Sequence, residues 1–162
     1  MKQIAIDKTR KRLAKASVCL ERIEASRSFG EFESAWTDLL IALDDIHTVL
    51  QQGAKTNPQS RQWYGGKKTE RRKDPLLSYL HQARNADKHG IEPIATHKPG
   101  GVKISEGAQP TFILKTAVKH GKPSFELHPV EGPGMEIVPP SAELIPVRFD
   151  RFGDVFVPPT QH

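Results

Sequence analysis

Apolar residues in the first part of the chain recur with the 3.6-residue period of amphipathic helices. Within residues 5–26, this period places four apolar positions on one face, namely Leu13, Ala16, Leu20 and Ile23. Charged residues occupy most of the remaining positions of the segment. The pattern predicts a first helix that packs through the apolar face.

The next segment carries the clearest helical pattern of the sequence. Ser28 followed three positions later by Glu31 matches a capping box, the side-chain pair that satisfies the first backbone N–H groups of a helix. From Phe32 onward the apolar residues keep helical spacing until Gly53, a residue type suited to end a helix. We therefore predict a second helix here, with Trp36 in its core-facing or dimer-facing stripe.

A third helix is predicted to start at Asp74 and Pro75. Asp74 is a favoured N-cap residue, and proline is favoured at the first helical position, where no backbone N–H is needed. The helix should end near His89, because Gly90 follows it and Pro93 prevents its continuation.

Residues 54–73, between the second and third predicted helices, are strongly basic. Two adjacent glycines and an Asn–Pro pair indicate an irregular loop, in which a further short helix could lie. Cations interleaved with aromatic rings suit contact with the phosphates and bases of a nucleic acid, whereas a solvated charged loop is the alternative. The residues predicted to bind nucleic acid are Trp63, Lys67, Lys68, Arg71 and Arg72.

The composition changes near residue 90. Eleven of the 13 prolines follow that point, and proline disrupts helices. Short extended runs beyond residue 100 predict two hairpins, the first formed by residues 111–118 and 124–127, the second by residues 144–149 and 155–157.

The predicted fold is therefore α+β, with an N-terminal helical bundle over residues 1–90 and a small antiparallel β appendage over residues 91–162. No segment approaches the roughly 18 apolar residues of a membrane span. The basic N-terminus lacks a following apolar stretch, so no signal peptide is predicted, and the lone Cys19 excludes an internal disulfide. We expect a cytoplasmic protein with no membrane partner.

The charge balance and the histidines add little on their own. The chain has 24 Lys and Arg against 19 Asp and Glu, a net charge of +5 that points weakly to anionic partners. The histidines show no recognised metal-ligand spacing, so we predict neither a metal nor a cofactor; those considered are His47, His81, His97, His120 and His128.

The sequence at the end of the third predicted helix carries the candidate chemistry. It reads Arg84-Asn85-x-x-x-His89, followed by Gly90. Five helical positions separate Arg84 from His89, which places them about 140° apart around a straight helix. The two side chains can therefore meet only if the helix is ending at His89 or if a second copy of the chain supplies the complementary pair.

This motif resembles the signature of HEPN domains, small all-α bundles with an Arg, four to six further residues and then a His. Many HEPN proteins are metal-independent endoribonucleases of toxin–antitoxin, abortive-infection and RNA-processing systems, and they typically dimerise so that two motifs line one cleft. The resemblance implies that Arg84 holds the scissile phosphate, that His89 acts as general acid or base, and that Asn85 orients both. Guanidinium and imidazole groups suit these roles.

The sequence thus predicts a homodimeric endoribonuclease that cleaves RNA through attack of the ribose 2′-hydroxyl, with a neutralising protein partner if it is a toxin. One alternative is a non-catalytic HEPN-like module that binds nucleic acid or protein. Another is a structural or regulatory dimer in which the strand-rich part is the recognition surface. For His81, one turn before Asn85, we favour a structural role.

Overall fold

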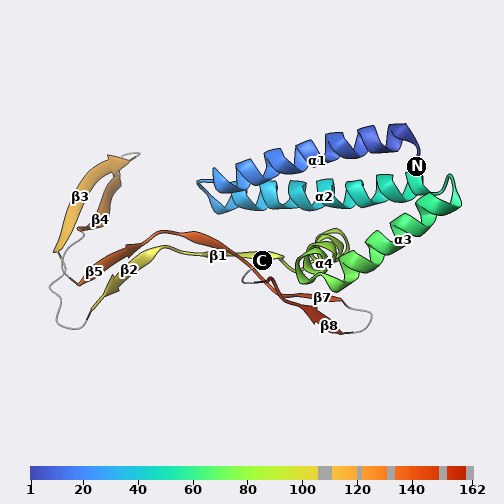
Figure 1. Cartoon of the computed structure of the whole chain (residues 1–162). Helices are drawn as coiled ribbons and strands as arrows, with labels where there is room; N and C mark the ends of the chain where they lie inside the picture. Colours follow the sequence, from blue (N-terminus) through green and yellow to red (C-terminus); the bar gives the residue numbers. More distant parts are fainter. Residues whose placement is uncertain (106–110, 120–121, 131–133, 150–152, 160–162) are drawn as a thin grey trace. The chain divides into compact units, whose positions relative to one another are not determined.

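The computed structural model describes residues 1–105, 111–119, 122–130, 134–149 and 153–159. Helices form the first part of the chain and short antiparallel strand pairs the second, so the α+β prediction is confirmed (Figure 1). The helices are α1 (Gln3–Glu24), α2 (Phe29–Ala54), α3 (Pro58–Lys73) and α4 (Pro75–His89). The strands are β1 (Ala95–Lys98), β2 (Gly101–Ile104), β3 (Thr111–Lys119), β4 (Lys122–Val130), β5 (Met135–Val138), β6 (Ser141–Leu144), β7 (Val147–Phe149) and β8 (Asp154–Phe156).

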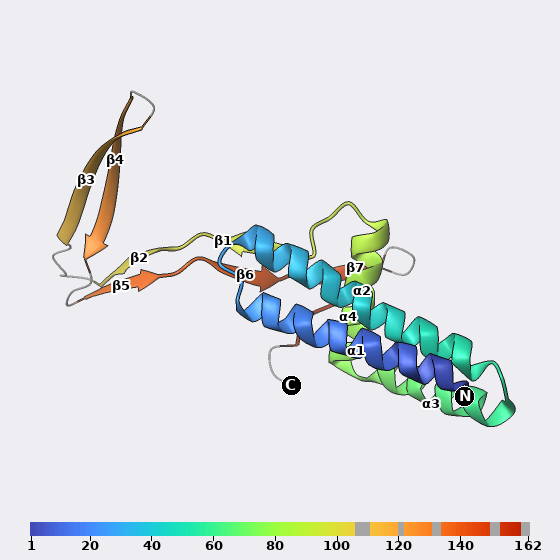
Figure 2. The ribbon, with the colours of Figure 1, turned by 90° about the horizontal axis from the view of Figure 1, so that it is seen from above.

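Helices α1 and α2 run antiparallel and side by side in both views (Figures 1 and 2). Small side chains form the buried side of α1: Ala5, Ala16 and Cys19 are each less than 10% exposed. The predicted apolar face was therefore partly wrong, since Leu13 is 57% and Leu20 is 50% exposed. Small residues let the two helix backbones approach closely, which leaves the larger side chains on the flank of the contact.

The N-terminus of α2 is capped as predicted. The Ser28 hydroxyl accepts a hydrogen bond from the backbone N–H of Glu31 at 3.2 Å. The Glu31 carboxylate accepts in turn from the backbone N–H of Arg27 at 2.8 Å, one residue before the position used in the usual capping box. Together these bonds satisfy two backbone donors at the start of the helix.

Gly53 does not cap α2, contrary to the prediction. It lies inside the helix and is buried, and the C-cap is Lys55. A β-carbon built on Gly53 would overlap the β-carbon of Ala5 on α1. The glycine is required because the two helices cross there at close range.

Residues 54–73 do not form the predicted loop, because most of them belong to α3. Asn57 caps this helix by accepting a hydrogen bond from the backbone N–H of Ser60 at 2.7 Å, and Pro58 occupies the first turn. The Tyr64 hydroxyl donates to the backbone carbonyl of His47 on α2 at 3.2 Å. The helix is almost wholly polar, so it carries no apolar stripe by which hydrophobic periodicity could identify it.

Helix α4 begins and ends where the sequence predicts. The Asp74 carboxylate accepts a hydrogen bond from the backbone N–H of Leu77 at 2.8 Å, and Pro75 is the first helical residue. The backbone N–H of Gly90 donates to the carbonyl of Ala86 at 2.6 Å. A β-carbon on Gly90 would lie only 2.6 Å from the same carbonyl oxygen, so glycine is needed to close the helix this tightly.

The core joins the helices to the last part of the chain. Its members include Trp36 and Leu40 of α2 and Tyr79 of α4, with Val147 of β7 packed in the same cluster. Trp36 is 6% exposed, as expected of a core residue. The Tyr79 hydroxyl donates to the backbone carbonyl of Ile145 at 3.0 Å and so anchors the segment before β7 on α4.

The chain forms two compact units, which we describe separately. One contains Met1–Thr96 and Ala142–His162, and the other contains His97–Ser141. This division differs from the predicted boundary at residue 90, because the C-terminal strands belong with the helices.

The strands form two-stranded sheets: β1 pairs with β6, β2 with β5, β3 with β4 and β7 with β8. The first predicted hairpin is confirmed: β3 and β4 are antiparallel, from Thr111 opposite Val130 to Lys119 opposite Lys122. Its connecting residues 120–121 lie outside the described part of the chain.

The second hairpin is shorter than predicted. Strands β7 and β8 pair antiparallel from Val147 opposite Phe156 to Phe149 opposite Asp154. Leu144 belongs instead to β6, which pairs with β1, and Pro146 lies between β6 and β7. The turn residues 150–152 are outside the described ranges.

Candidate functional site

Arg84 and His89 face different parts of the molecular surface. Helix α4 stays helical through His89, so the five positions between the two residues place them about 140° apart. Arg84 lines a small cavity between α2, α3 and α4, whereas His89 lines a wide groove at the end of α4. The sequence allowed two ways of bringing them together, a helix that is already ending at His89 or a second copy of the chain. Because the helix continues through His89, the first way is excluded within one protomer.

The groove beside His89 is wide, with a volume of about 960 Å³. One wall is the end of α4 with the residues that follow it, and the other is Ile145–Arg148. Its polar side chains are Asn85, His89, Glu92 and Arg148. Asn85 and His89 are one helical turn apart on α4, and both line this groove, as the sequence predicts for residues four positions apart.

Asn85 was predicted to orient both Arg84 and His89. Its side-chain amide donates to the Gln82 carbonyl oxygen at 3.2 Å. Asn85 also lines the groove of His89, and Arg84 does not. The structure therefore places Asn85 near His89 but not near Arg84 in that groove.

Arg84 is held by an acidic neighbour. Its guanidinium forms an ion pair with Asp87 at 3.1 Å, and the two side chains are 17% and 23% exposed. Asp87 also accepts a hydrogen bond from the Thr37 hydroxyl of α2 at 3.5 Å. The Nε of Arg84 is buried and has no hydrogen-bond partner among the described residues, an unusual state for a charged donor. This local network ties Arg84 to the helix packing.

The small cavity beside Arg84 contains two histidines. Its volume is about 40 Å³, enough for a water molecule or two but not for a nucleotide. Burial, helped by the nearby charge of Arg71, lowers the pKa of His47 to about 4, while Asp44 opposes the shift. Burial also lowers the pKa of His81, with a further contribution from Arg71. Both imidazoles are therefore neutral at neutral pH, and the enclosed setting fits the structural role favoured for His81.

The four predicted nucleic-acid-binding cations lie on α3 instead of on a loop. Helical spacing places Lys67, Lys68, Arg71 and Arg72 within an arc of about 140°. Lys68 and Arg72 are exposed, whereas Arg71 lines the cavity beside Arg84.

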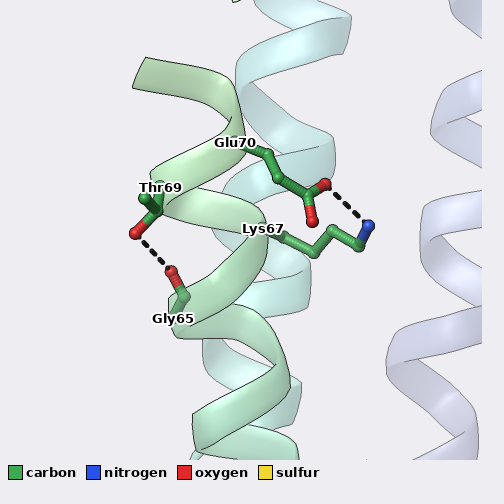
Figure 3. Close-up of polar contacts among 4 residues, drawn as sticks. All are labelled: Gly65, Lys67, Thr69 and Glu70. Atoms are coloured by element: carbon green, nitrogen blue, oxygen red, sulfur yellow. Dashed lines mark hydrogen bonds and ion pairs between the residues drawn. The ribbon is translucent and has the colours of Figure 1, made fainter. Parts of the chain in front are cut away.

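Lys67 is paired within its own helix. Its ammonium contacts the Glu70 carboxylate at 2.7 Å (Figure 3). On another side of α3 the Thr69 hydroxyl donates to the carbonyl of Gly65 at 3.1 Å. Glu70 therefore offsets part of the positive charge that the sequence predicts for this segment.

Trp63 lies on the same helix, one turn before Lys67. It is 46% exposed and lines a separate, mainly apolar cavity near the start of α1. The structure thus carries Trp63 and the four cations on one helix, with Trp63 lining a cavity that none of the four cations lines.

Sequence reasoning missed two charged residues of the groove. Glu92 comes three residues after His89, beyond the helix end, and nothing in the sequence distinguishes it from a solvated acid. Arg148 is brought to the groove by the chain segment that Tyr79 anchors. No sequence motif could have identified this long-range contact.

Comparisons with family models, curated proteins and solved structures found no match. Within the described residues, no helix is long and apolar enough to span a membrane, and no three His, Cys, Asp or Glu side chains are grouped to hold a metal ion.

Proposed function

We propose that this protein is an endoribonuclease that cleaves RNA by metal-independent attack of the ribose 2′-hydroxyl, in the groove at the end of α4. One observation carries the proposal: an imidazole, a carboxylate, a guanidinium and an amide line the same groove, those of His89, Glu92, Arg148 and Asn85. The volume of about 960 Å³ leaves room for a phosphodiester with its flanking nucleosides.

Each of these groups has a role in the proposed reaction. Glu92 accepts the proton of the 2′-hydroxyl as the 2′-oxygen bonds to phosphorus. Protonated His89 donates a proton to the 5′-oxygen as the bond between phosphorus and that oxygen breaks. The products are a 2′,3′-cyclic phosphate and a 5′-hydroxyl. Arg148 pairs with the non-bridging phosphate oxygens, and Asn85 positions the substrate beside His89.

The HEPN resemblance assigns the phosphate to Arg84 instead, in a homodimer where the motifs of two copies share one cleft. The ion pair of Arg84 with Asp87 and its separate cavity favour Arg148 for this role within one protomer. The two arrangements differ in their mutational signatures. If Arg148 binds the phosphate, Arg148→Ala lowers the cleavage rate strongly and Arg84→Ala does not.

The test is the cleavage rate of end-labelled single-stranded RNA in EDTA. We expect His89→Ala to lower the rate by about 100-fold or more, the usual contribution of a general acid. Lys88→Ala is the matched control, because Lys88 is exposed on the same helix and does not line the groove. A wild-type protein that leaves RNA intact, or a His89→Ala variant as active as the control, would contradict the proposal.

A second candidate function is nucleic-acid binding without cleavage. The restraint of Arg84 by Asp87 favours it, since the motif arginine is already paired in the absence of RNA. Its signature is a salt-sensitive mobility shift with intact RNA that His89→Ala leaves unchanged. In either case we place the protein in the cytoplasm, and a toxin role would add a neutralising protein partner.

A further inference from the structure

A second large cavity lies between the first half of α1, the end of α2 and the start of α3. Its volume is about 470 Å³, within the range typical of small-molecule sites. Its walls are largely apolar, formed by Met1, Ile6, Leu50 and Trp63. It shares no lining residue with the groove at the end of α4.

Thr9 lines this cavity with its hydroxyl turned away from the open space. Its Oγ1 is inaccessible to solvent and has no hydrogen-bond partner among the residues that the structure describes. A threonine within a helix can bond the carbonyl four residues earlier, but this one does not do so. Leaving a buried hydroxyl unpaired is unfavourable, so rotating the Thr9 side chain to pair with a bound molecule recovers that energy.

Arg10 supplies a positive charge at the same cavity. It lines the cavity, and its side chain is 75% exposed, which places its charge at the solvent-facing side. Its contact with Asp7 is long, 3.9 Å, and both side chains are in water, so the pair is weak. The Arg10 guanidinium can therefore leave Asp7 and pair with a ligand at a small cost in free energy. Ser60, by contrast, already accepts a hydrogen bond from the Met1 nitrogen at 2.6 Å.

We propose that this cavity binds a small amphipathic carboxylate, with an alkyl or aryl body of drug-like size. The body packs against Ile6, Leu50 and Trp63, and a polar atom of the ligand hydrogen-bonds the Thr9 hydroxyl. The carboxylate pairs with Arg10 at the mouth. A bare phosphate or a sugar–phosphate chain does not suit walls that are mainly apolar. The site is independent of the proposed cleavage reaction.

Calorimetric titration with decanoate, below its micelle-forming concentration, tests the proposal. We expect saturable binding at one site per chain, and weaker binding of the uncharged decanol. Arg10→Gln should reduce the preference for decanoate over decanol, and the Met1 ammonium at the same cavity accounts for any preference that remains. Thr9→Val, which keeps the shape but lacks the hydroxyl, should weaken decanoate binding by about three- to tenfold.

A large side chain placed inside the cavity tests whether decanoate binds there. Leu50→Trp should abolish decanoate binding, whereas Val18→Trp introduces the same side chain at an exposed position of α1 outside the cavity and should leave binding unchanged. Thermal unfolding of each variant confirms that it is folded. His89→Ala should bind decanoate like the wild type, which separates this site from the groove.

Three results would overturn the inference. The first is no heat of binding for the folded wild-type protein. The second is binding that Leu50→Trp leaves intact. The third is a wild-type dimer in sedimentation that Leu50→Trp dissociates, because the occupant of the cavity would then be a second copy of the chain.

Discussion

Gly53 offers the sharpest test of how the helices pack. Replacing glycine by alanine inside a helix ordinarily stabilises it by about 1 kcal/mol, because glycine loses more backbone freedom on folding. At Gly53 the new β-carbon would overlap that of Ala5 and lie 3.4 Å from the Met1 side chain. Crowding of this kind in a packed contact costs about 1–3 kcal/mol. We therefore expect Gly53→Ala to change stability by about 0 to −2 kcal/mol.

Gly65 and Gly66 are matched controls inside α3. A β-carbon at either position meets no atom within 4 Å. Gly65→Ala and Gly66→Ala should therefore each gain about 1 kcal/mol, equivalent to a rise of roughly 4 °C in Tm for a unit of this size.

Chemical denaturation of the wild type and the three variants measures these changes, provided that the unfolding slope stays constant. Two further variants, Ala5→Gly alone and Ala5→Gly combined with Gly53→Ala, complete a mutant cycle, since removing the Ala5 methyl group restores the missing space. We expect a favourable coupling of about 1 kcal/mol or more between these two positions. If Gly53→Ala stabilises the protein as much as Gly66→Ala, the close crossing of α1 and α2 is refuted.

Three further predictions concern a buried histidine, the basic helix and the anchor of the groove. Folding lowers the pKa of His47 from about 6.5 to about 4, so the neutral imidazole contributes its full share of stability above pH 6.5. The free energy of unfolding should fall by about 1–2 kcal/mol as the pH drops towards 4. Denaturation at pH 7 and at pH 4.5 should show a smaller loss for His47→Gln than for the wild type. Glu70→Gln should release Lys67 and tighten RNA binding with a steeper salt dependence, whereas unchanged binding would place the RNA elsewhere. Tyr79→Phe should lower the free energy of unfolding by about 1 kcal/mol, through loss of the bond to Ile145, and an unchanged Tm would argue against that anchor.

A helix could be predicted where the sequence shows both a capping residue and an apolar stripe. Helices α2 and α4 combine caps with an apolar stripe, and both were identified correctly. Helix α3 has the same N-terminal signature as α4, an N-cap residue followed by proline, but its body is polar and contains two glycines. Charge and glycine suggested a loop, whereas the Asn57 cap and the Tyr64 contact with α2 favour the helix.

The candidate site was predictable only where it depends on helical geometry. The separation of Arg84 and His89 follows from the number of residues between them, and the structure confirms it. The proximity of Asn85 to His89 follows in the same way. Arg148 could not be foreseen, because its position depends on how the C-terminal segment packs against α4. The ion pair of Arg84 with Asp87 could not be foreseen either, because the same residues fit a helix end whose charged side chains all face solvent.

The most direct measurement uses a DNA strand that contains a single ribonucleotide, incubated with the protein in EDTA. Only that nucleotide has a 2′-hydroxyl, so the proposed reaction predicts one cut on its 3′ side, with a 2′,3′-cyclic phosphate and a 5′-hydroxyl as the new ends. His89→Ala should slow the cut by about 100-fold or more, and an all-DNA strand should stay intact. Cleavage elsewhere in the strand, or cleavage at the ribonucleotide that His89→Ala leaves unchanged, would contradict the proposed role of the groove.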